Sequence, residues 1–299
     1  MLKKLSDLNN LLDKSSEPKK LVLAAAEELE GLEALSRAQS QGIIEVILVG
    51  DKEQIDNIIN KNNINLTISK IIDEKDPAES ARIAVKLVHD KKADILMKGN
   101  VGTSDLLKAV LDKKIGLRKG ELLSHFALFE IKGYHKLLAL TDVAINIAPN
   151  FHHKIAIINN SIDFLHKLGI KTPKIAAIGA VEMVNENMQA TLDAALLAIM
   201  AQRKQFKNCI IDGPLAFDNA ISKESAIHKK IDSKVAGDAD LLFLPDIEVG
   251  NVLYKSLVFF AKAQMACVIL GASAPIILTS RSDSMQAKLY SILLAAVTA

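Results

Sequence analysis

The sequence predicts an α/β protein of two domains, with mixed, largely parallel sheets and an interdomain cleft. Two observations support this fold. Short runs rich in Val, Ile and Leu alternate along the chain with stretches whose apolar residues recur every three or four positions, the pattern of strands that alternate with helices. The chain has 299 residues, of which 49% are hydrophobic, and this is enough for two buried cores.

A series of apolar runs is predicted to form the strands. Their unbroken apolar character is typical of strands that are buried on both faces in a parallel sheet. The runs are LVLAAA (21–26), IIEVILVG (43–50), ADILMKG (93–99), LLSHFALFEI (122–131), HKLLALTDV (135–143), PKIAAIGAV (173–181), CIIDGPL (209–215), ADLLFLPDI (239–247), ACVILGAS (266–273) and PIILTS (275–280).

Helices are predicted between these runs. Asp51 and Asp76 each begin a capping box, and Pro77 suits the first helical position. Gly169 is the predicted C-terminal cap of a helix that starts at His152. Apolar periodicity predicts helices at 152–168, 188–203, 252–263 and 285–294, and a short amphipathic helix through Leu2, Leu5, Leu8 and Leu12.

The domain boundary is placed where a block of consecutive strands gives way to a long helix, near residues 143–151. We expect residues 1–145 and 279–299 to form the first α/β domain and residues 146–278 to form the second. The last strand and helix would then return to the first domain.

Composition argues against several classes of partner. The net charge is +2 and aromatic residues make up 4% of the chain, so the basic and aromatic surface that nucleic acid requires is not expected. The longest apolar stretch, 265–278, is interrupted and too short to cross a membrane. The start lacks a signal-peptide pattern, and Cys209 and Cys267 stand in apolar contexts that favour buried free thiols. We therefore expect a cytoplasmic protein that binds neither nucleic acid nor membrane.

Polar residues gather where predicted strands end, which is where α/β sheets bind ligands. In PIILTSRSDS, Arg281 suits a two-pronged grip on phosphate or carboxylate; it could also be a surface residue beside an N-cap at Ser282 or Ser284. In the KGNVGTSD segment, glycines, hydroxyls and a helix start could cradle an anion, or form an ordinary capped turn. The candidates in this segment are Lys98, Gly99, Gly102, Thr103 and Ser104.

Further clusters follow other strands. The strand LALT is followed by Asp142, and the strand LLFL is followed by Asp246, Asn251 and Lys255. Any one of these could be a helix cap, but several at strand ends indicate a cleft. A Mg²⁺ site remained an open alternative, built from Asp212, Asp218, Asp238, Asp240 and Asp246. The motifs GxxxxGK[ST], GxGxxG, HExxH, CxxC and GxSxG are absent.

Several of these segments, in this order, resemble the blocks of the phosphate acetyl/butyryl transferase family. The resemblance runs from about residue 20 to the C-terminus. The compact length of the chain and its SHFALFE and TDVAINIAPN blocks look closer to the phosphate butyryltransferase branch than to phosphate acetyltransferase. The blocks are KGNVGTSDLLKAVLDK, LLSHFALFEI, LLALTDVAINIAPN, VEMVNENMQATLDAALLA, DGPLAFDNAISKESAIHK, GDADLLFLPDIEVGNVLYKSLVFFA and ILTSRSDS.

The resemblance implies the reaction acyl-CoA + phosphate ⇌ acyl phosphate + CoA, with a butyryl group expected. It implies direct attack without a covalent intermediate, no bound cofactor, and coenzyme A or acyl-CoA as substrate. It also implies a fold like that of isocitrate and isopropylmalate dehydrogenases, and a homodimer or a higher homo-oligomer.

When the family's pattern is matched to this chain position by position, the resemblance assigns Ser280 and Arg281 to catalysis. The Asp that serves similar acetyltransferases as a base would fall at Gln286 or Ala287, neither of which can take a proton. Asp283 is the nearest carboxylate and is a candidate substitute, with a capping or structural role as its alternative.

Three other functions stay open. One is phosphate acetyltransferase activity. Another is a dehydrogenase on the same fold, which the scattered arginines disfavour. The third is a non-catalytic CoA-binding homologue, to which the altered base position gives weight.

Overall fold

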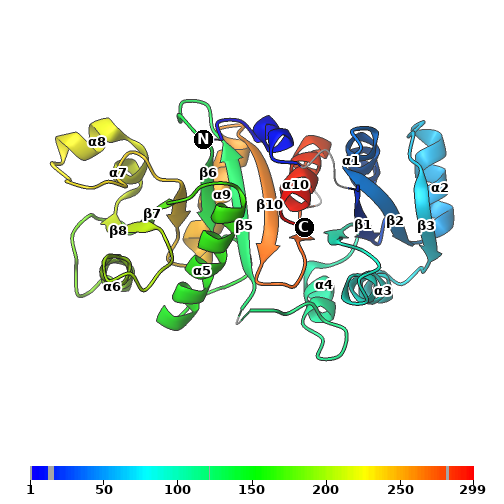
Figure 1. Cartoon of the computed structure of the whole chain (residues 1–299), viewed down its shortest axis with the longest axis horizontal. Helices are drawn as coiled ribbons and strands as arrows, with labels where there is room; N and C mark the ends of the chain where they lie inside the picture. The colour runs from blue at the N-terminus through cyan, green and yellow to red at the C-terminus, as the bar shows by residue number, and fades with distance from the viewer. Residues whose placement is uncertain (1, 13–16, 121, 281–282) are drawn as a thin grey trace. The chain divides into compact units, whose positions relative to one another are not determined.

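The computed structural model describes residues 2–12, 17–120, 122–280 and 283–299. The chain divides into two compact units, which Figure 1 shows in ribbon form. Unit 1 comprises Met1–Asp7 and Leu122–Met265, and unit 2 comprises Leu8–Glu121 and Ala266–Ala299. The chain changes unit earlier than at the predicted domain boundaries, because β6 pairs with β9 and joins the strands of 122–141 to the residues that follow. The predicted domain division stays a prediction.

The sheet of unit 2 has the strand order β3-β2-β1-β4-β11-β10. All neighbours are parallel except β10 and β11, which are antiparallel. The C-terminal strand returns to pair with β4, with Ile277 opposite Met97. The strands are β1 (Lys19–Ala24), β2 (Ile44–Gly50), β3 (Ile68–Asp73), β4 (Ile95–Lys98), β10 (Gln264–Leu270, in this unit from Ala266) and β11 (Ile276–Ile277).

The helices of unit 2 cover both faces of this sheet. The helix α3 packs against β1, β2 and β4, whereas α1 packs against β2 and α10. Both predicted capping residues are confirmed, since Asp51 accepts the Gln54 N–H and Asp76 accepts the N–H groups of Ala78 and Glu79. The helices are α1 (Leu29–Ser40), α2 (Lys52–Lys61), α3 (Pro77–His89), α4 (Thr103–Val110) and α10 (Met285–Thr298).

The sheet of unit 1 has the order β5-β6-β9-β7-β8, with β5 antiparallel to β6 and the other neighbours parallel. The predicted class of mixed, largely parallel sheets with helices is therefore confirmed in both units. The strands are β5 (Ser124–Glu130), β6 (Leu138–Thr141), β7 (Lys174–Ile178), β8 (Ile210–Leu215) and β9 (Leu241–Phe243).

Five helices accompany this sheet. Gly169, with a positive φ of 82°, follows the end of α5 as predicted. The last helix begins earlier than the predicted 252, because Asp246 caps it and accepts the Val249 N–H. The helices are α5 (Phe151–Lys167), α6 (Gln189–Gln202), α7 (Phe217–Ile221), α8 (Lys223–His228) and α9 (Ile247–Phe259).

Two further elements differ from expectation. The edge strand β3 was not predicted, because half of the residues of its sequence ISKIID are exposed, none is buried, and it lacks a continuous apolar run. The N-terminal segment forms a 3₁₀ helix at Leu5–Asn10 rather than an α-helix. Its Leu5 and Leu8 are both fully buried, which fits the three-residue repeat of that helix.

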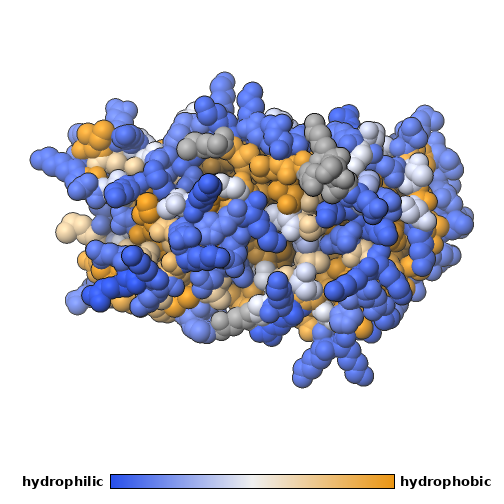
Figure 2. Space-filling model, in the orientation of Figure 1, coloured by the Kyte–Doolittle hydropathy of each residue, from blue (hydrophilic) through white to orange (hydrophobic). Residues whose placement is uncertain are grey.

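The surface is mainly hydrophilic on the face that Figure 2 shows, with scattered hydrophobic side chains. Within the described ranges, no helix combines the length and the apolar character that a membrane crossing needs.

Candidate functional site

The sheet of unit 2 brings two predicted clusters to one edge. Because β4 and β11 are parallel, with Ile277 opposite Met97, the segments 98–104 and 278–280 leave the sheet as neighbours. Lys98 and Ser280, which are far apart in sequence, thus belong to adjoining strand ends. This is the convergence that ligand sites of α/β sheets require.

The first segment is held tightly against β1. The Lys98 side chain is 4% exposed, and its Nζ donates to the Gly99 carbonyl at 3.1 Å. The Gly99 N–H donates to Ala24, and a Cβ at Gly99 would lie 2.2 Å from the Ala25 carbonyl oxygen. Gly99 is therefore required by its packing on β1, and its N–H is not available to an anion.

The start of α4 is more open. Gly102 is its N-cap and supplies no capping side chain, and Thr103 and Ser104 are exposed. The first turn also carries Asp105, whose carboxylate pairs with Lys108 at 3.1 Å. An anion at this helix start would gain from the N–H groups and hydroxyls, but would meet the Asp105 charge.

In the second segment, two hydrogen bonds join Ser280 and Asp283. The Asp283 side chain is 7% exposed, and its Oδ2 accepts the Ser280 N–H at 2.7 Å. The Asp283 N–H in return donates to the Ser280 carbonyl at 3.1 Å. Ser284 is the N-cap of α10, since its Oγ accepts the Ala287 N–H. Arg281 and Ser282, which the sequence singled out, lie outside the described residues.

Three side chains near this edge were not predicted. Lys288 is 1% exposed and its Nζ lies 2.7 Å from the Glu28 carboxylate. One carboxylate oxygen of Glu27 is buried without a hydrogen bond in the described part of the chain, and burial raises the pKa of this group. In the sequence, Glu27 and Glu28 directly follow the strand run LVLAAA, and this position at a strand end could have identified them as candidate site residues. Lys288 could not be identified in this way, because it lies within an apolar helix and not at the end of a strand.

Cys267 lies in the same region, and both cysteines are free. Its Sγ is 3.3 Å from the Leu278 carbonyl oxygen, and burial raises the pKa of the thiol to about 12. The prediction of a buried free thiol is confirmed for Cys267, whereas Cys209 is half-buried. A thiol with this pKa is a poor nucleophile near neutral pH.

At the carboxyl edge of the unit 1 sheet, Asp142 organises its own loop. The carboxylate is buried and accepts the N–H groups of Ala144 and Ile145 at 2.9 and 3.0 Å. It also accepts the Asn146 side-chain amide at 2.6 Å. With three donors already bound, Asp142 has a clear structural role.

The start of α9 packs on this loop. Gly250 permits the close approach, since a Cβ there would lie 2.4 Å from the Asp142 carbonyl oxygen. The Asn251 side chain donates to the Val143 carbonyl at 3.3 Å. Unit 1 therefore brings Asp142, Asp246 and Asn251 to one edge. Lys255, one turn further along α9, is half-buried, with its Nζ 5.8 Å from the Tyr254 ring centre.

His125 of β5 was not predicted as a site residue. It is buried, and burial lowers its pKa to about 4, although the nearby Asp142 charge opposes the shift. Its Nδ1 makes no hydrogen bond among the described residues. The neutral ring packs edge-on against Tyr254, with 6.1 Å between centroids.

The aspartates of the magnesium alternative are occupied by other contacts. Asp238 and Asp240 both pair with Lys136, and Asp218 pairs with Lys229. Asp246 caps α9. Over the ranges that the structure describes, no group of three or more His, Cys, Asp or Glu side chains could hold a metal ion.

Sequence comparison places these features in a known family. The family model described as "Phosphate acetyl/butaryl transferase" matches residues 8–83 and 77–296. The phosphate butyryltransferase of Clostridium beijerinckii is 50% identical over 281 residues, 94% of this chain and 93% of that protein. The phosphate acetyltransferase of Thermotoga maritima is 44% identical over 94% of this chain and 95% of that protein.

Solved structures agree with this placement. A branched-chain phosphotransacylase from Enterococcus faecalis V583 is similar, with a TM-score of 0.83 and 34% identity over 93% of this chain and 98% of that chain. A 4-hydroxythreonine-4-phosphate dehydrogenase from Klebsiella pneumoniae has a TM-score of 0.58 at 15% identity, over 93% of this chain and 98% of that chain. This second likeness shows a shared dehydrogenase-like fold alone.

Proposed function

Because the chain belongs to the phosphate acetyl/butyryl transferase family, we propose that it transfers a short acyl group between CoA and inorganic phosphate. The reaction is acyl-CoA + phosphate ⇌ acyl phosphate + CoA, by direct attack of a phosphate oxygen on the thioester carbonyl. The observation that supports this most is the pairing of β4 with β11, which brings the segments 98–104 and 278–280 to one sheet edge.

Phosphate and CoA are both anions, so a site that holds both needs cations and N–H donors to offset their repulsion. We assign Arg281 as the two-pronged clamp on phosphate. Lys98 is already buried at the neighbouring strand end and adds positive charge. The exposed hydroxyls of Thr103 and Ser104 at the start of α4 add donors, with Gly102 leaving room beside them. Gly99 contributes by its packing alone.

Attack on the carbonyl produces a tetrahedral intermediate with a negatively charged oxygen, for which Ser280 is the proposed hydrogen-bond donor. The CoA thiolate then leaves, and its modest pKa makes an acid helpful rather than essential. The buried Asp283 carboxylate holds the Ser280 backbone, so its first role is to position that residue. It is also the nearest candidate base for the CoA thiol in the reverse direction.

In unit 1, we propose that Asp142, Asp246, Asn251 and Lys255 contribute to phosphate or CoA binding. The contacts that each side chain already makes limit how it can take part in binding. Asp142 and Asp246 act by shaping the loop and the start of α9, since their carboxylates are bound to N–H groups. Lys255 is the residue of this set that can offer a positive charge to a CoA phosphate.

The acyl group is proposed to be butyryl or a similar short or branched chain. The similar proteins named for butyryl and for branched-chain substrates support this choice, while the 44% identical acetyltransferase keeps acetyl as the alternative. CoA takes part as substrate, and no bound cofactor or metal is required by the proposed chemistry.

We further propose a cytoplasmic homo-oligomer built on a dimer. The two free cysteines suit a reducing compartment. Exposed apolar side chains on and beside α9, among them Val252 and Phe260, suit a surface that another subunit covers.

The test is to measure the amounts of free thiol and acyl phosphate that the protein forms from butyryl-CoA. Thiol release should require phosphate, and acyl phosphate, trapped as its hydroxamate, should form in equal amount. Release without phosphate would indicate a hydrolase instead. Tight CoA binding with no acyl phosphate from any acyl-CoA would favour the non-catalytic alternative.

A further inference from the structure

Unit 1 contains a cavity of about 280 Å³ that the proposed reaction does not use. It lies at the amino ends of its strands, because Lys136 and Leu137 precede β6, Lys174 begins β7 and Asp240 precedes β9. In parallel strands this edge of the sheet is opposite to the edge where Asp142 and Asp246 lie. The cavity is therefore separate from the residues assigned above.

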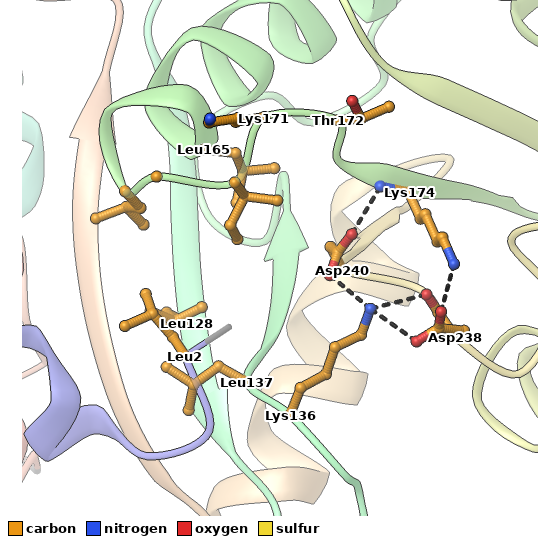
Figure 3. Close-up of a pocket in the computed structure, with 13 residues that line it drawn as sticks. Leu2, Leu128, Lys136, Leu137, Leu165, Lys171, Thr172, Lys174, Asp238 and Asp240 are labelled. Atoms are coloured by element: carbon orange, nitrogen blue, oxygen red, sulfur yellow. Dashed lines mark hydrogen bonds and ion pairs between the residues drawn. The ribbon is translucent and has the colours of Figure 1, made fainter.

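One wall of the cavity is aliphatic. Figure 3 shows leucine side chains from β5, from the start of β6 and from α5 facing the interior on the side away from the charged residues. A wall of this kind gains free energy from an alkyl chain and offers nothing to a sugar or a base. The leucines are Leu2, Leu128, Leu137, Leu165 and Leu168.

The opposite wall carries charged side chains that pair with one another, so that their charges cancel. Lys136 Nζ lies 2.5 Å from Asp240 Oδ1 and 2.9 Å from Asp238 Oδ1, and it donates to the Asp238 carbonyl oxygen. Lys174 pairs with Asp238 as well, and its N–H donates to Asp240. The three donors of Lys136 are thus occupied, and these four residues have no net charge. This wall therefore adds polarity and leaves no unmatched ion.

A positive charge that these ion pairs do not neutralise lies at the exposed rim of the cavity, on Lys171. Lys171 and Thr172 are exposed members of the lining, and Figure 3 shows them together at one end of the cavity. No carboxylate in the described ranges lies within ion-pair distance of Lys171. At the adjacent end of α5, the carbonyls of His166 and Leu165 accept the N–H groups of Gly169 and Ile170.

We propose that this cavity is a second ligand site that binds a short aliphatic carboxylate. The alkyl chain lies along the leucines, and the carboxylate binds Lys171 and Thr172. The volume is below the range of about 300–1,000 Å³ typical of pockets for drug-sized ligands, which limits the ligand to a short chain. The inference does not depend on the proposed acyl transfer.

The experiment follows the leucine methyl resonances of the ¹³C-labelled chain by NMR while butyrate, pentanoate or hexanoate is added. Shifts should be confined to the five leucines of the cavity wall. Affinity should rise about fourfold with each CH₂ until the cavity is filled. Hexanol, which keeps the tail but lacks the charge, should bind more weakly than hexanoate.

The matched pair of variants is Lys171→Ala and Lys132→Ala, since both lysines are exposed in unit 1 and Lys132 lies outside the lining. Hexanoate affinity should fall about fivefold or more in Lys171→Ala and stay unchanged in Lys132→Ala. Equal affinity in both variants, no dependence on chain length, or shifts at leucines elsewhere would overturn the proposal.

Discussion

Asp283 and Ser280 show how one carboxylate can fix a candidate site. The Ser280 N–H donates to Asp283 at 2.7 Å, and Asp283 directly precedes Ser284, the N-cap of α10. Ser280 is thereby held relative to the helix that follows. A positioning role and a base role for Asp283 differ in their dependence on pH, so they can be separated.

The substitution Asp283→Asn keeps an oxygen that can accept the Ser280 N–H but removes the ability to take a proton. We expect the CoA-consuming rate to fall by less than about tenfold, and by the same factor at every pH, because the hydrogen bond from the Ser280 N–H is retained. The measurement is the initial rate of acyl-CoA formation from acyl phosphate and CoA between pH 6 and 9. A loss that is greatest at low pH would instead identify Asp283 as the base.

The substitution Arg281→Lys keeps the charge but loses the planar fork. We expect turnover to fall by about 100-fold, with weaker apparent affinity for phosphate and an unchanged fold, because a single ammonium cannot bind two phosphate oxygens in the same geometry. Steady-state kinetics with varied phosphate measure this. The control is Arg82→Lys on the surface of α3, and equal kinetics in the two variants would mean that Arg281 is not the clamp.

At the scale of the element, the strands of this protein were predictable because each is a compact apolar run buried in its sheet. The exception, β3, exposes half of its residues at an edge, so its pattern does not stand out. The ends of the helices were less predictable, since α9 begins where Asp246 caps it rather than where its apolar repeat is regular. The Lys288–Glu28 pair joins residues 260 positions apart, and nothing local in the sequence indicates it.

The burial of His125 in β5 makes the stability of unit 1 dependent on pH. The pKa of His125 is about 4 in the folded chain, below its ordinary value of about 6.5. Between these values the unfolded chain binds the extra proton, so stability is complete above about pH 6.5 and is lost as pH falls. The expected loss from His125 between pH 7 and pH 4 is on the order of 3 kcal/mol.

Urea unfolding of the parent and of His125→Phe at pH 7 and pH 4.5 measures this contribution. The variant should show a smaller decrease in the free energy of unfolding, and the exposed His228→Gln should behave like the parent. The same decrease in parent and His125→Phe would show that His125 does not carry the effect.

At the scale of the whole molecule, the family was recognisable from sequence because its blocks extend through most of the chain. The roles of the individual residues within each block were harder to predict. Gly99 resembled part of an anion cradle, but in the structure it is needed for contact with β1. Asp246, predicted as a binding residue, also caps α9. Polar residues at strand ends serve loops and helix starts as well as substrates, and a sequence does not distinguish these uses.

Acyl selectivity is the least visible property, since one methylene changes it by only about 1–3 kcal/mol. It is also the property that separates two kinds of relative of this chain, the butyryl and the acetyl transferases.

The most direct test of the proposed function is kcat/KM for phosphate-dependent thiol release from acetyl-, butyryl- and isobutyryl-CoA under one set of conditions. The proposal predicts that butyryl-CoA, or its branched isomer, exceeds acetyl-CoA by about tenfold or more, as two additional methylenes in an apolar pocket imply. A preference for acetyl-CoA would contradict the assignment to the butyryl branch, and no phosphate-dependent release from any of the three would contradict the proposed activity itself.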